Sequence, residues 1–581
     1  MRPIDKTILV IGLLLTLIRC GAKDQTSPTL SGDMPIVVFS DEAGSYKGRT
    51  KTISLQAPPG YSIFYTLDGS TPSRKSIPYT KPIVLGKKGN RWVDSQVAER
   101  MTLTHEGKQI YPIKQSSSVP GANIIRAIAV APDGTYSEVV TKTFFIGANL
   151  EEDFRDAMVI SIVTDLGNLL DNERGILVKG KVYDEWLGNE TADSIMNNKL
   201  WWKVKTNYTM KGKAWERPAS IEFFDASNRL TLSQDCGIRV KGRISRASAQ
   251  KSFNIFFKNN GADTVVSYPF LPNALKADSG EMIKEYEAIS LRNGGNDADY
   301  LKFKDAWLQS RVYDKVYSTQ KSRLAVLFLN GEYWGHYNLI EKYDQKYIEN
   351  HYGVKNCLII SEKKVDKGSR YDYHLYEELM SFKDKDLTEE AIWEEFKQVM
   401  DIRNMAEYFA TEIYIGNYDW SEIANTTLWR STIPDPSNPY ADGRWHFMLS
   451  DVEYSSGLYN QYGTYFTFDT FAHALKGHPL FASVIRNPEF QDLFLSAIRD
   501  VASRNFSPDD VVIDLKAWAK RWKPFMRHYY RRFKKVPGHW HNDIRSISTF
   551  FKKRSGFLMP AIEKELERIT QDKANTAAVS P

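Results

Sequence analysis

The stretch that decides the fold of this 581-residue chain runs from residue 404 to residue 457 and reads NMAEYFATEIYIGNYDWSEIANTTLWRSTIPDPSNPYADGRWHFMLSDVEYSSG. Met405, Phe409 and Ile413 recur at helical spacing, and Gly416 stands where a left-handed residue ends a helix. A polar loop follows, then a short strand, a turn-rich link and a second strand over 444–453. The stretch therefore predicts a helix and two strands joined by loops that carry carboxylates.

Three polar side chains of this stretch could serve one site. Asp419 and Asn425 lie in the loop after the helix, and Asp451 lies near the end of the second strand. The residues that alternate before Asp451 are apolar, so we expect it to continue a buried face; they are Trp445, Phe447 and Leu449. A buried carboxylate is costly unless it is paired or bound to a cation. The three side chains offer oxygen ligands and a base, as magnesium-assisted phosphoryl transfer requires.

The motifs Asn-x-Asp-Trp, an Asn before Leu-Trp-Arg, and Arg-Trp-x-Phe-x-Leu-x-Asp resemble the signature of the spore coat protein H (CotH) kinase family. The resemblance implies an atypical, secreted or surface-associated kinase with a divergent protein-kinase-like fold. It implies that Asp419 is the catalytic-loop residue, Asp451 the magnesium ligand and Asn425 the second metal ligand. Asn425 lies one residue further from the aspartate than in the usual kinase loop. Where the family often has Asp-x-Asp, this chain has Asp451-Val452-Glu453, so the second acid of the motif is a glutamate.

A second segment, GIRVKGRISRASAQKSFNIFF over 237–257, resembles the family's nucleotide-side motif. By period two, Lys251 shares a face with the apolar residues of the following strand, so we expect an anionic partner, either a carboxylate or a phosphate. The alternative is a lysine that reaches solvent from the strand end. Lys241, Arg243 and Arg246 in the preceding loop could cradle phosphates or form a solvated turn.

A third segment, LNGEYWGHYNLIE over 329–341, also matches the family, and its Asn330-Gly331 pair predicts a tight hairpin. Glu341 is our candidate partner for Lys251, in the sense of the kinase Lys–Glu ion pair, with a surface glutamate as the alternative. Aromatic residues crowd the loop from 459 to 471. We expect them to pack as core or lid, and the alternative is a platform for a substrate.

The N-terminal region contains a predicted signal peptide and a separate β module. Residues 1–19 combine early basic residues with an apolar run, as an export signal does. Cys20 resembles a bacterial lipoprotein processing site, which implies a lipid anchor in an outer or surface membrane; plain secretion is the alternative. Residues 20–34 read as a tether. Strands and turns follow over 35–147, where IFYTLDGSTP (63–72) resembles the chitobiase/β-hexosaminidase C-terminal-type β-sandwich, a spacer without catalytic residues.

The predicted fold class is a multidomain α+β protein: the β-sandwich, then a kinase-like α+β domain over 151–570 with a helical C-terminal part, then a disordered tail over 571–581. A net charge of +6 over this length does not favour nucleic acid as a partner. The basic, aromatic segment 516–535 is interpreted as a solvated helix face rather than an anion-binding surface. Cys236 and Cys357 are expected to be buried free thiols.

Our leading hypothesis is an extracytoplasmic, surface-anchored or secreted kinase that uses ATP and magnesium to phosphorylate protein hydroxyls. The alternative is a non-catalytic surface protein that binds glycans or a protein partner on the same fold. A glycoside hydrolase is the third reading, but no acid/nucleophile pair is recognisable. The sequence does not identify the phosphate acceptor.

Overall fold

The computed structural model describes residues 36–579, except 90–94, 102–103, 106–107, 110–119, 199, 228 and 534–539. The predicted signal peptide, Cys20 and the tether lie outside the described residues. Within the described ranges, no helix is both long and apolar enough to cross a bilayer.

The N-terminal module is mostly β, as predicted. Its main sheet has the strand order β2 (Gly44–Tyr46), β13 (Val140–Ile146), β12 (Asn123–Val130), β5 (Ser62–Thr66), β6 (Ile77–Pro78). Two antiparallel pairs accompany this sheet: β3 (Thr50–Ile53) with β7 (Ile83–Gly86), and β1 (Val38–Phe39) with β4 (Leu55–Gln56). On β7, Ile83 and Leu85 are buried while Val84 is exposed, which is the alternation of a strand with one face on a core.

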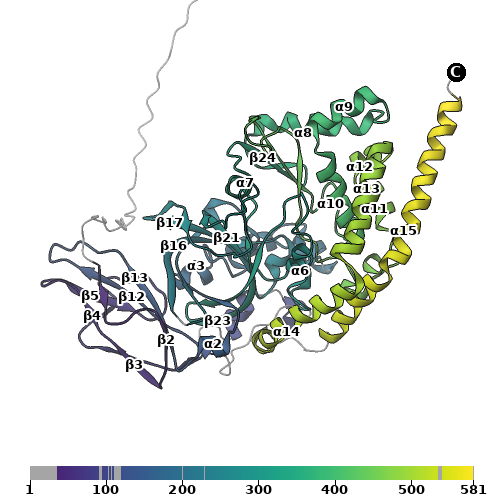
Figure 1. Ribbon diagram of the computed structural model, residues 1–581. Coiled ribbons are helices and arrows are strands. Elements are labelled where there is room, and N and C mark those ends of the chain that lie inside the picture. Colours follow the sequence, from purple (N-terminus) through teal and green to yellow (C-terminus); the bar gives the residue numbers. More distant parts are fainter. Residues whose placement is uncertain are drawn as a thin grey trace, which may run out of the picture.

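The second domain opens with a closed sheet. Its strand order is β16-β15-β14-β22-β23-β21-β17-β18, and β16 also pairs with β17, so seven strands form a barrel (Figure 1). The strands are β14 (Met158–Val163), β15 (Arg217–Phe224), β16 (Leu230–Lys241), β17 (Ser252–Asn259), β18 (Ala262–Asp263), β21 (Ala288–Arg292), β22 (Ser322–Leu329) and β23 (Glu332–Glu341). The predicted hairpin is confirmed: Asn330 and Gly331 join β22 to β23 with φ of 45° and 78°.

A four-stranded sheet follows the barrel, in the order β25 (Lys364–Lys367), β24 (Cys357–Ser361), β26 (Thr427–Ser431), β27 (His446–Met448). The predicted helix is α10 (Ile402–Ile415). The Asp401 side chain caps its start by accepting from the Asn404 N–H at 3.0 Å, and Gly416 ends it with φ of 71°. The strand predicted to reach residue 453 ends at Met448. The other helices of this part are α7 (Gln345–Tyr352), α8 (His374–Ser381) and α9 (Glu390–Val399).

The C-terminal part is helical, as predicted, and lies to the right in Figure 1. It contains α11 (Thr470–Gly477), α12 (Pro479–Val484), α13 (Pro488–Asp500), α14 (Pro508–Phe533) and α15 (Trp540–Val579). The basic segment 516–535 is mostly α14, which buries Trp522, Phe525 and Tyr529 and pairs buried Arg532 with Glu332 at 2.5 Å. The disordered tail predicted from residue 571 is wrong up to Val579, because α15 continues to that residue.

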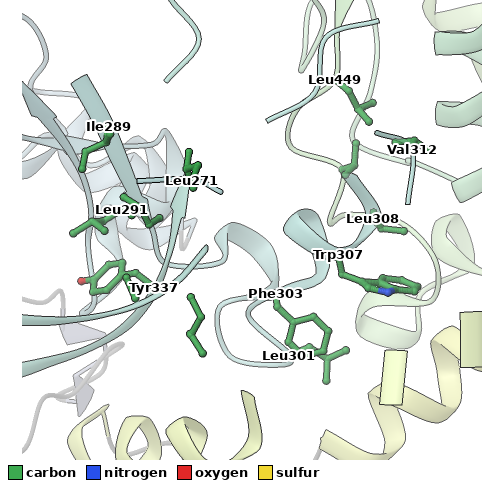
Figure 2. Packing of buried hydrophobic residues seen from close by; sticks show 14 of the residues in the cluster. Leu271, Ile289, Leu291, Leu301, Phe303, Trp307, Leu308, Val312, Tyr337 and Leu449 are labelled. Atoms are coloured by element: carbon green, nitrogen blue, oxygen red, sulfur yellow. The ribbon is translucent and has the colours of Figure 1, made fainter. Parts of the chain in front are cut away.

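One hydrophobic core joins the barrel to the rest of the second domain. Figure 2 shows Ile289 of β21 and Tyr337 of β23 on one side, and Trp307 of α6 (Lys304–Ser310) with Leu449 on the other; all are fully buried members of the same cluster. The N-terminal module docks on the barrel through Phe145, whose ring lies 4.9 Å from that of Phe328. Cys236 and Cys357 are buried free thiols, as expected.

Candidate active site

A cavity of about 570 Å³ lies between the outer face of the barrel and the four-stranded sheet. The barrel contributes polar residues that alternate with core residues, among them Arg239, Lys241 and Arg292, and the sheet side contributes Thr427 and Asp451. Cationic side chains outnumber carboxylates in the lining: Lys211, Arg239, Lys241, Arg246, Arg292, Lys342 and Lys367 against Asp366 and Asp451. Such a lining suits a polyanionic ligand.

Asp451 stands in this cavity on a left-handed backbone. Its φ is 55°, and its side chain is 52% exposed and contacts the Arg292 guanidinium. Burial acts to raise the pKa of Asp451, but the charges of Arg292 and Lys241 outweigh it and lower that pKa. The prediction that Asp451 continues a buried strand face is wrong, because the strand ends at Met448 and the chain turns. The expected cationic partner is present, and it is Arg292.

Arg292 is held by carboxylates on several sides. Its Nη2 lies 3.0 Å from both carboxylate oxygens of buried Glu453, and its Nη1 lies 3.6 Å from Asp305. The Asn296 N–H donates to Glu453 at 3.0 Å and so fixes that carboxylate in turn. Arg292 was not among the predicted site residues, although it ends an otherwise apolar strand, as Asp451 was expected to do.

Asp419 and Asn425 lie together beside this cluster. The Asn425 side-chain amide donates to the Asp419 carbonyl at 2.5 Å, and Asn425 has a positive φ of 58°. Burial raises the pKa of Asp419, and the negative charge of Asp451 adds to the rise, while Asn425 and Arg243 oppose it. The charge of Asp451 therefore acts on Asp419, and the roles predicted for the two aspartates stay predictions.

The donors present fit a magnesium ion that is completed by its ligand. Within the described part of the chain, no group of three or more His, Cys, Asp or Glu side chains is arranged to hold a metal. Magnesium is commonly bound by one or two carboxylates together with phosphate oxygens and water. Asp451, which is half exposed and whose pKa is lowered, is such a carboxylate, and Asn425 lies in the loop of Asp419 outside the cavity lining.

Lys251 does not make the predicted contact. Its side chain is fully buried, and its ammonium donates to the carbonyls of Arg246 and Ser248 at 3.0 and 3.1 Å over the Tyr208 ring. Burial lowers the pKa of Lys251 to about 7. Lys251 thus closes the 242–250 loop on itself, so both the anionic partner and the solvent-reaching alternative are wrong.

Glu341 is engaged elsewhere. It accepts from the backbone N–H of Lys321 at 2.9 Å, and His351 Nε2 lies 2.6 Å from its other oxygen. The predicted Lys251–Glu341 ion pair is therefore not formed. Glu341 is buried, so the surface alternative is wrong as well.

The two loop arginines differ in role. Arg246 lines the cavity but donates to the carbonyls of Gly242 and Met210 at 2.5 and 2.7 Å, so it mainly holds the loop. Arg243 is 73% exposed, pairs with Glu362 at 3.5 Å and does not line the cavity. Neither is buried against a carboxylate that would exclude a phosphate.

Lys241 was predicted together with Arg243 and Arg246 as a cation that could cradle phosphates, and it is the one of the three whose ammonium group faces the cavity without a partner among the described residues. It ends β16 and lines the cavity, and burial lowers its pKa to about 8, with the charge of Arg292 adding to the effect and that of Asp451 opposing it. No hydrogen bond or ion pair engages its ammonium group among the residues that the structure describes. It is therefore available to an anionic ligand.

Comparison with known proteins gives two family matches. The family model described as CotH kinase protein matches residues 238–558, which is more than half of the chain and includes the cavity residues from β16 to Asp451. The family model described as Fn3 associated matches residues 53–144, within the N-terminal β module. That description differs from the chitobiase-type module that the sequence resembles. None of the curated proteins matches the chain significantly.

Proposed function

Because the chain belongs to the CotH kinase protein family, we propose that it transfers a phosphoryl group from ATP, with magnesium, to a hydroxyl group of a protein. The observation that carries the proposal is the basic cavity, which contains Asp451 and adjoins Asp419. Polyphosphate binding and metal binding require these two kinds of group side by side.

Each residue has a separate task in this proposal. The Lys241 ammonium binds a phosphate oxygen. Arg239, which is paired with Glu216 at 2.6 Å, and Lys342, which is paired with Asp344 at 2.8 Å, line the wall beside it. Asp451 and Asn425 would hold magnesium, which when bound neutralises charge on the phosphates. Arg292 fixes the Asp451 carboxylate and adds a further positive charge next to it.

Asp419 orients the acceptor hydroxyl and takes its proton. The hydroxyl oxygen forms a bond to the γ-phosphorus while the bond from that phosphorus to the bridging oxygen breaks, and ADP leaves with the bonding electron pair. Since the pKa of Asp419 is raised, its carboxylate is a stronger base than an ordinary aspartate.

A non-catalytic surface protein is the second candidate, because Arg292 contacts the carboxylate that would bind the metal. In that case Arg292 serves in place of the cation and the cavity binds no magnesium nucleotide.

The deciding experiment combines thermal shift with transfer of radiolabelled phosphate from ATP, on the chain without its first 30 residues. Asp419→Ala and Asp451→Ala are compared with Asp384→Ala, which removes a 76% exposed carboxylate outside the cavity. Label incorporated by the parent and the control but lost in both site variants supports the kinase. A folded parent that neither incorporates label nor gains stability from magnesium-ATP refutes it and supports the second candidate.

We also propose that the chain is exported and anchored through a lipidated Cys20, with the N-terminal β module as a spacer. Mass spectrometry of the mature N-terminus tests this: a diacylated cysteine supports the anchor, and an unmodified N-terminus after cleavage supports plain secretion.

A further inference from the structure

The loop that carries Asp419 rests on two buried polar side chains of α10. Its motif Asn417-Tyr418-Asp419-Trp420 alternates in burial: Asn417 and Trp420 are buried, whereas the two residues between them reach solvent. The exposed aspartate is thus flanked by two buried side chains, and what holds these two side chains decides where its carboxylate lies.

Each flanking side chain is held by a polar group of α10. The Asn417 amide donates to Glu412 Oε2 at 2.9 Å, and the Asn417 backbone N–H donates to the Glu412 carbonyl at 3.1 Å. The Trp420 indole N–H donates to the Tyr408 hydroxyl at 3.0 Å. Tyr408 and Glu412 are one helical turn apart, so they lie on the same face of the helix. One face of α10 therefore holds the loop on both sides of Asp419.

Core packing alone does not explain these contacts. The four side chains that make them are each no more than 1% exposed: Tyr408, Glu412, Asn417 and Trp420. A buried polar group is costly unless it is hydrogen-bonded, and an apolar pair at positions 408 and 412 would fill the same core without that cost. What the polar pair adds is direction, because satisfied buried hydrogen bonds fix how the loop leaves the helix.

Glu412 is mostly uncharged at neutral pH. Burial raises the pKa of Glu412 from 4.5 to about 8 and the charge of Asp305 adds to the rise, while Asn417 and Tyr408 oppose it. At pH 7 the carboxyl group therefore keeps its proton in most molecules. A glutamine at this position would match both the shape and the charge of that protonated form, so Glu412→Gln is a conservative variant.

The same loop is also bound to the segment that follows Asp451. The Tyr418 N–H donates to the Tyr454 carbonyl at 3.0 Å. Ser456 donates twice to the Ile415 carbonyl near the end of α10, through its N–H at 3.1 Å and through its hydroxyl at 2.8 Å. The helix and this segment together therefore set the position of the two site aspartates relative to each other.

We propose that Tyr408 and Glu412 are positioning residues for phosphoryl transfer. By holding the residues on either side of Asp419, they place its carboxylate against the acceptor hydroxyl. This role rests on the proposed kinase function. Neither side chain lines the basic cavity, so the two residues act on the acceptor side of the reaction and leave the binding of the nucleotide unchanged.

Phosphoryl transfer from radiolabelled ATP is measured first, with a peptide of alternating glycine and serine as the acceptor. Tyr408→Phe removes the hydroxyl that accepts from the indole, Glu412→Leu removes the acceptor of the side-chain amide, and Glu412→Gln keeps an acceptor there. The matched control is Tyr414→Phe on the same helix, where the lost hydroxyl is bonded to Ser555 of α15 at 2.8 Å.

A catalytic group that is misplaced by about 1 Å can lower the rate by roughly 100-fold. We therefore expect Tyr408→Phe and Glu412→Leu to lower kcat by about 10- to 100-fold, while the Kd of magnesium-ATP stays unchanged. Glu412→Gln and the control should keep the kcat of the parent. Each variant is checked by its Tm, and Tyr408→Phe, which loses a single hydroxyl, decides the question if Glu412→Leu does not fold.

Hydrogen exchange of segment 416–426, followed by mass spectrometry, is measured second and requires no activity. We expect faster exchange of this segment in Tyr408→Phe and Glu412→Leu than in the parent, Glu412→Gln and the control. If the parent transfers no phosphate, faster exchange confined to this segment supports the hold of α10 on the loop while the kinase function fails, so the two proposals fail separately. Unchanged exchange in both folded variants overturns the proposal. So does a parental kcat in a variant with faster exchange, or a Glu412→Gln that is as slow in transfer as Glu412→Leu.

Discussion

Replacing each of two lysines by methionine tests which one binds the nucleotide. Lys241→Met removes an ammonium that lines the basic cavity and has no partner among the described residues. Lys251→Met removes an ammonium that is fully buried and bonded to the carbonyls of Arg246 and Ser248. The two variants change the same kind of side chain, Lys241 at the end of β16 and Lys251 directly before β17, so each is the control for the other.

The magnitudes follow from these contacts. A hydrogen bond to a charged group contributes about 1.5–3 kcal/mol, so Lys241→Met should weaken ATP binding by roughly 10- to 150-fold at about 1.4 kcal/mol per factor of ten. It should leave the free energy of unfolding almost unchanged. Lys251→Met leaves two carbonyls without a donor, which costs about 1–3 kcal/mol for each group that stays unsatisfied. We therefore expect a lower Tm and an ATP affinity close to that of the parent.

The assay is isothermal titration of magnesium-ATP into each folded variant, with urea unfolding in parallel. Loss of ATP binding in a folded Lys251→Met, together with normal binding in Lys241→Met, would refute the assignment. It would restore the nucleotide-binding role that the family resemblance implies for Lys251. Loss of binding in both would mean that the loop between the two strands has to be intact for the cavity to form.

Three further results are expected. Asp451→Asn should abolish the stabilisation that magnesium adds to ATP in a thermal shift, while metal-free ATP still binds through Lys241; an undiminished magnesium effect would argue against the metal role. Burial raises the pKa of Glu222 from 4.5 to about 8, so the folded chain keeps a proton there that the unfolded chain loses. The free energy of unfolding should then fall by up to about 1.4 kcal/mol per pH unit between those values; Glu222→Gln should remove this part of the slope in urea titrations, and parallel curves would contradict it. Arg532→Met, which breaks the buried pair with Glu332, should lower the free energy of unfolding by about 3–5 kcal/mol. The double variant Arg532→Met/Glu332→Met should restore most of that loss if the unpaired charge of Glu332 causes it, and an equally unstable double variant would contradict this.

Much of the fold could be predicted because its signals are local. The apolar spacing of α10 and the left-handed stop at Gly416 depend on a few neighbouring residues, and so does the turn at Asn330. The end of β27 at Met448 could not be predicted in this way. The pattern after it still alternates, and what ends the strand is a chain reversal in which Asp451 meets Arg292, 159 residues away in sequence.

The site depends on which face of each strand borders the cavity. The alternation of residues along a strand separates its two faces but does not show which of them faces the cavity. Lys251 shares its face with Phe253 and Ile255, and that face is turned into the core of the closed barrel, where backbone carbonyls satisfy the ammonium. Lys241 and Arg292 lie on the opposite face, on the two strands that flank Ser252 of β17. Lys241 of β16 is paired directly with Ser252. Arg292 of β21 is one position beyond Leu291, which is paired with Phe253.

The polar residues that alternate with buried residues along these strands are thus the ones that can contact an anionic ligand. Along β16, Arg239 and Lys241 interleave with buried Ile238 and Val240, and along β21, Arg292 follows buried Leu291. Lys241 was predicted as one of three loop cations, while Arg239 and Arg292 can be recognised only by their place on the polar side of apolar strands; Lys251 lies on the apolar side. The difference is physical: the buried ammonium of Lys251 is satisfied by carbonyls of its own loop, whereas the ammonium of Lys241 lines the cavity with no hydrogen bond among the described residues and can bind an anionic ligand.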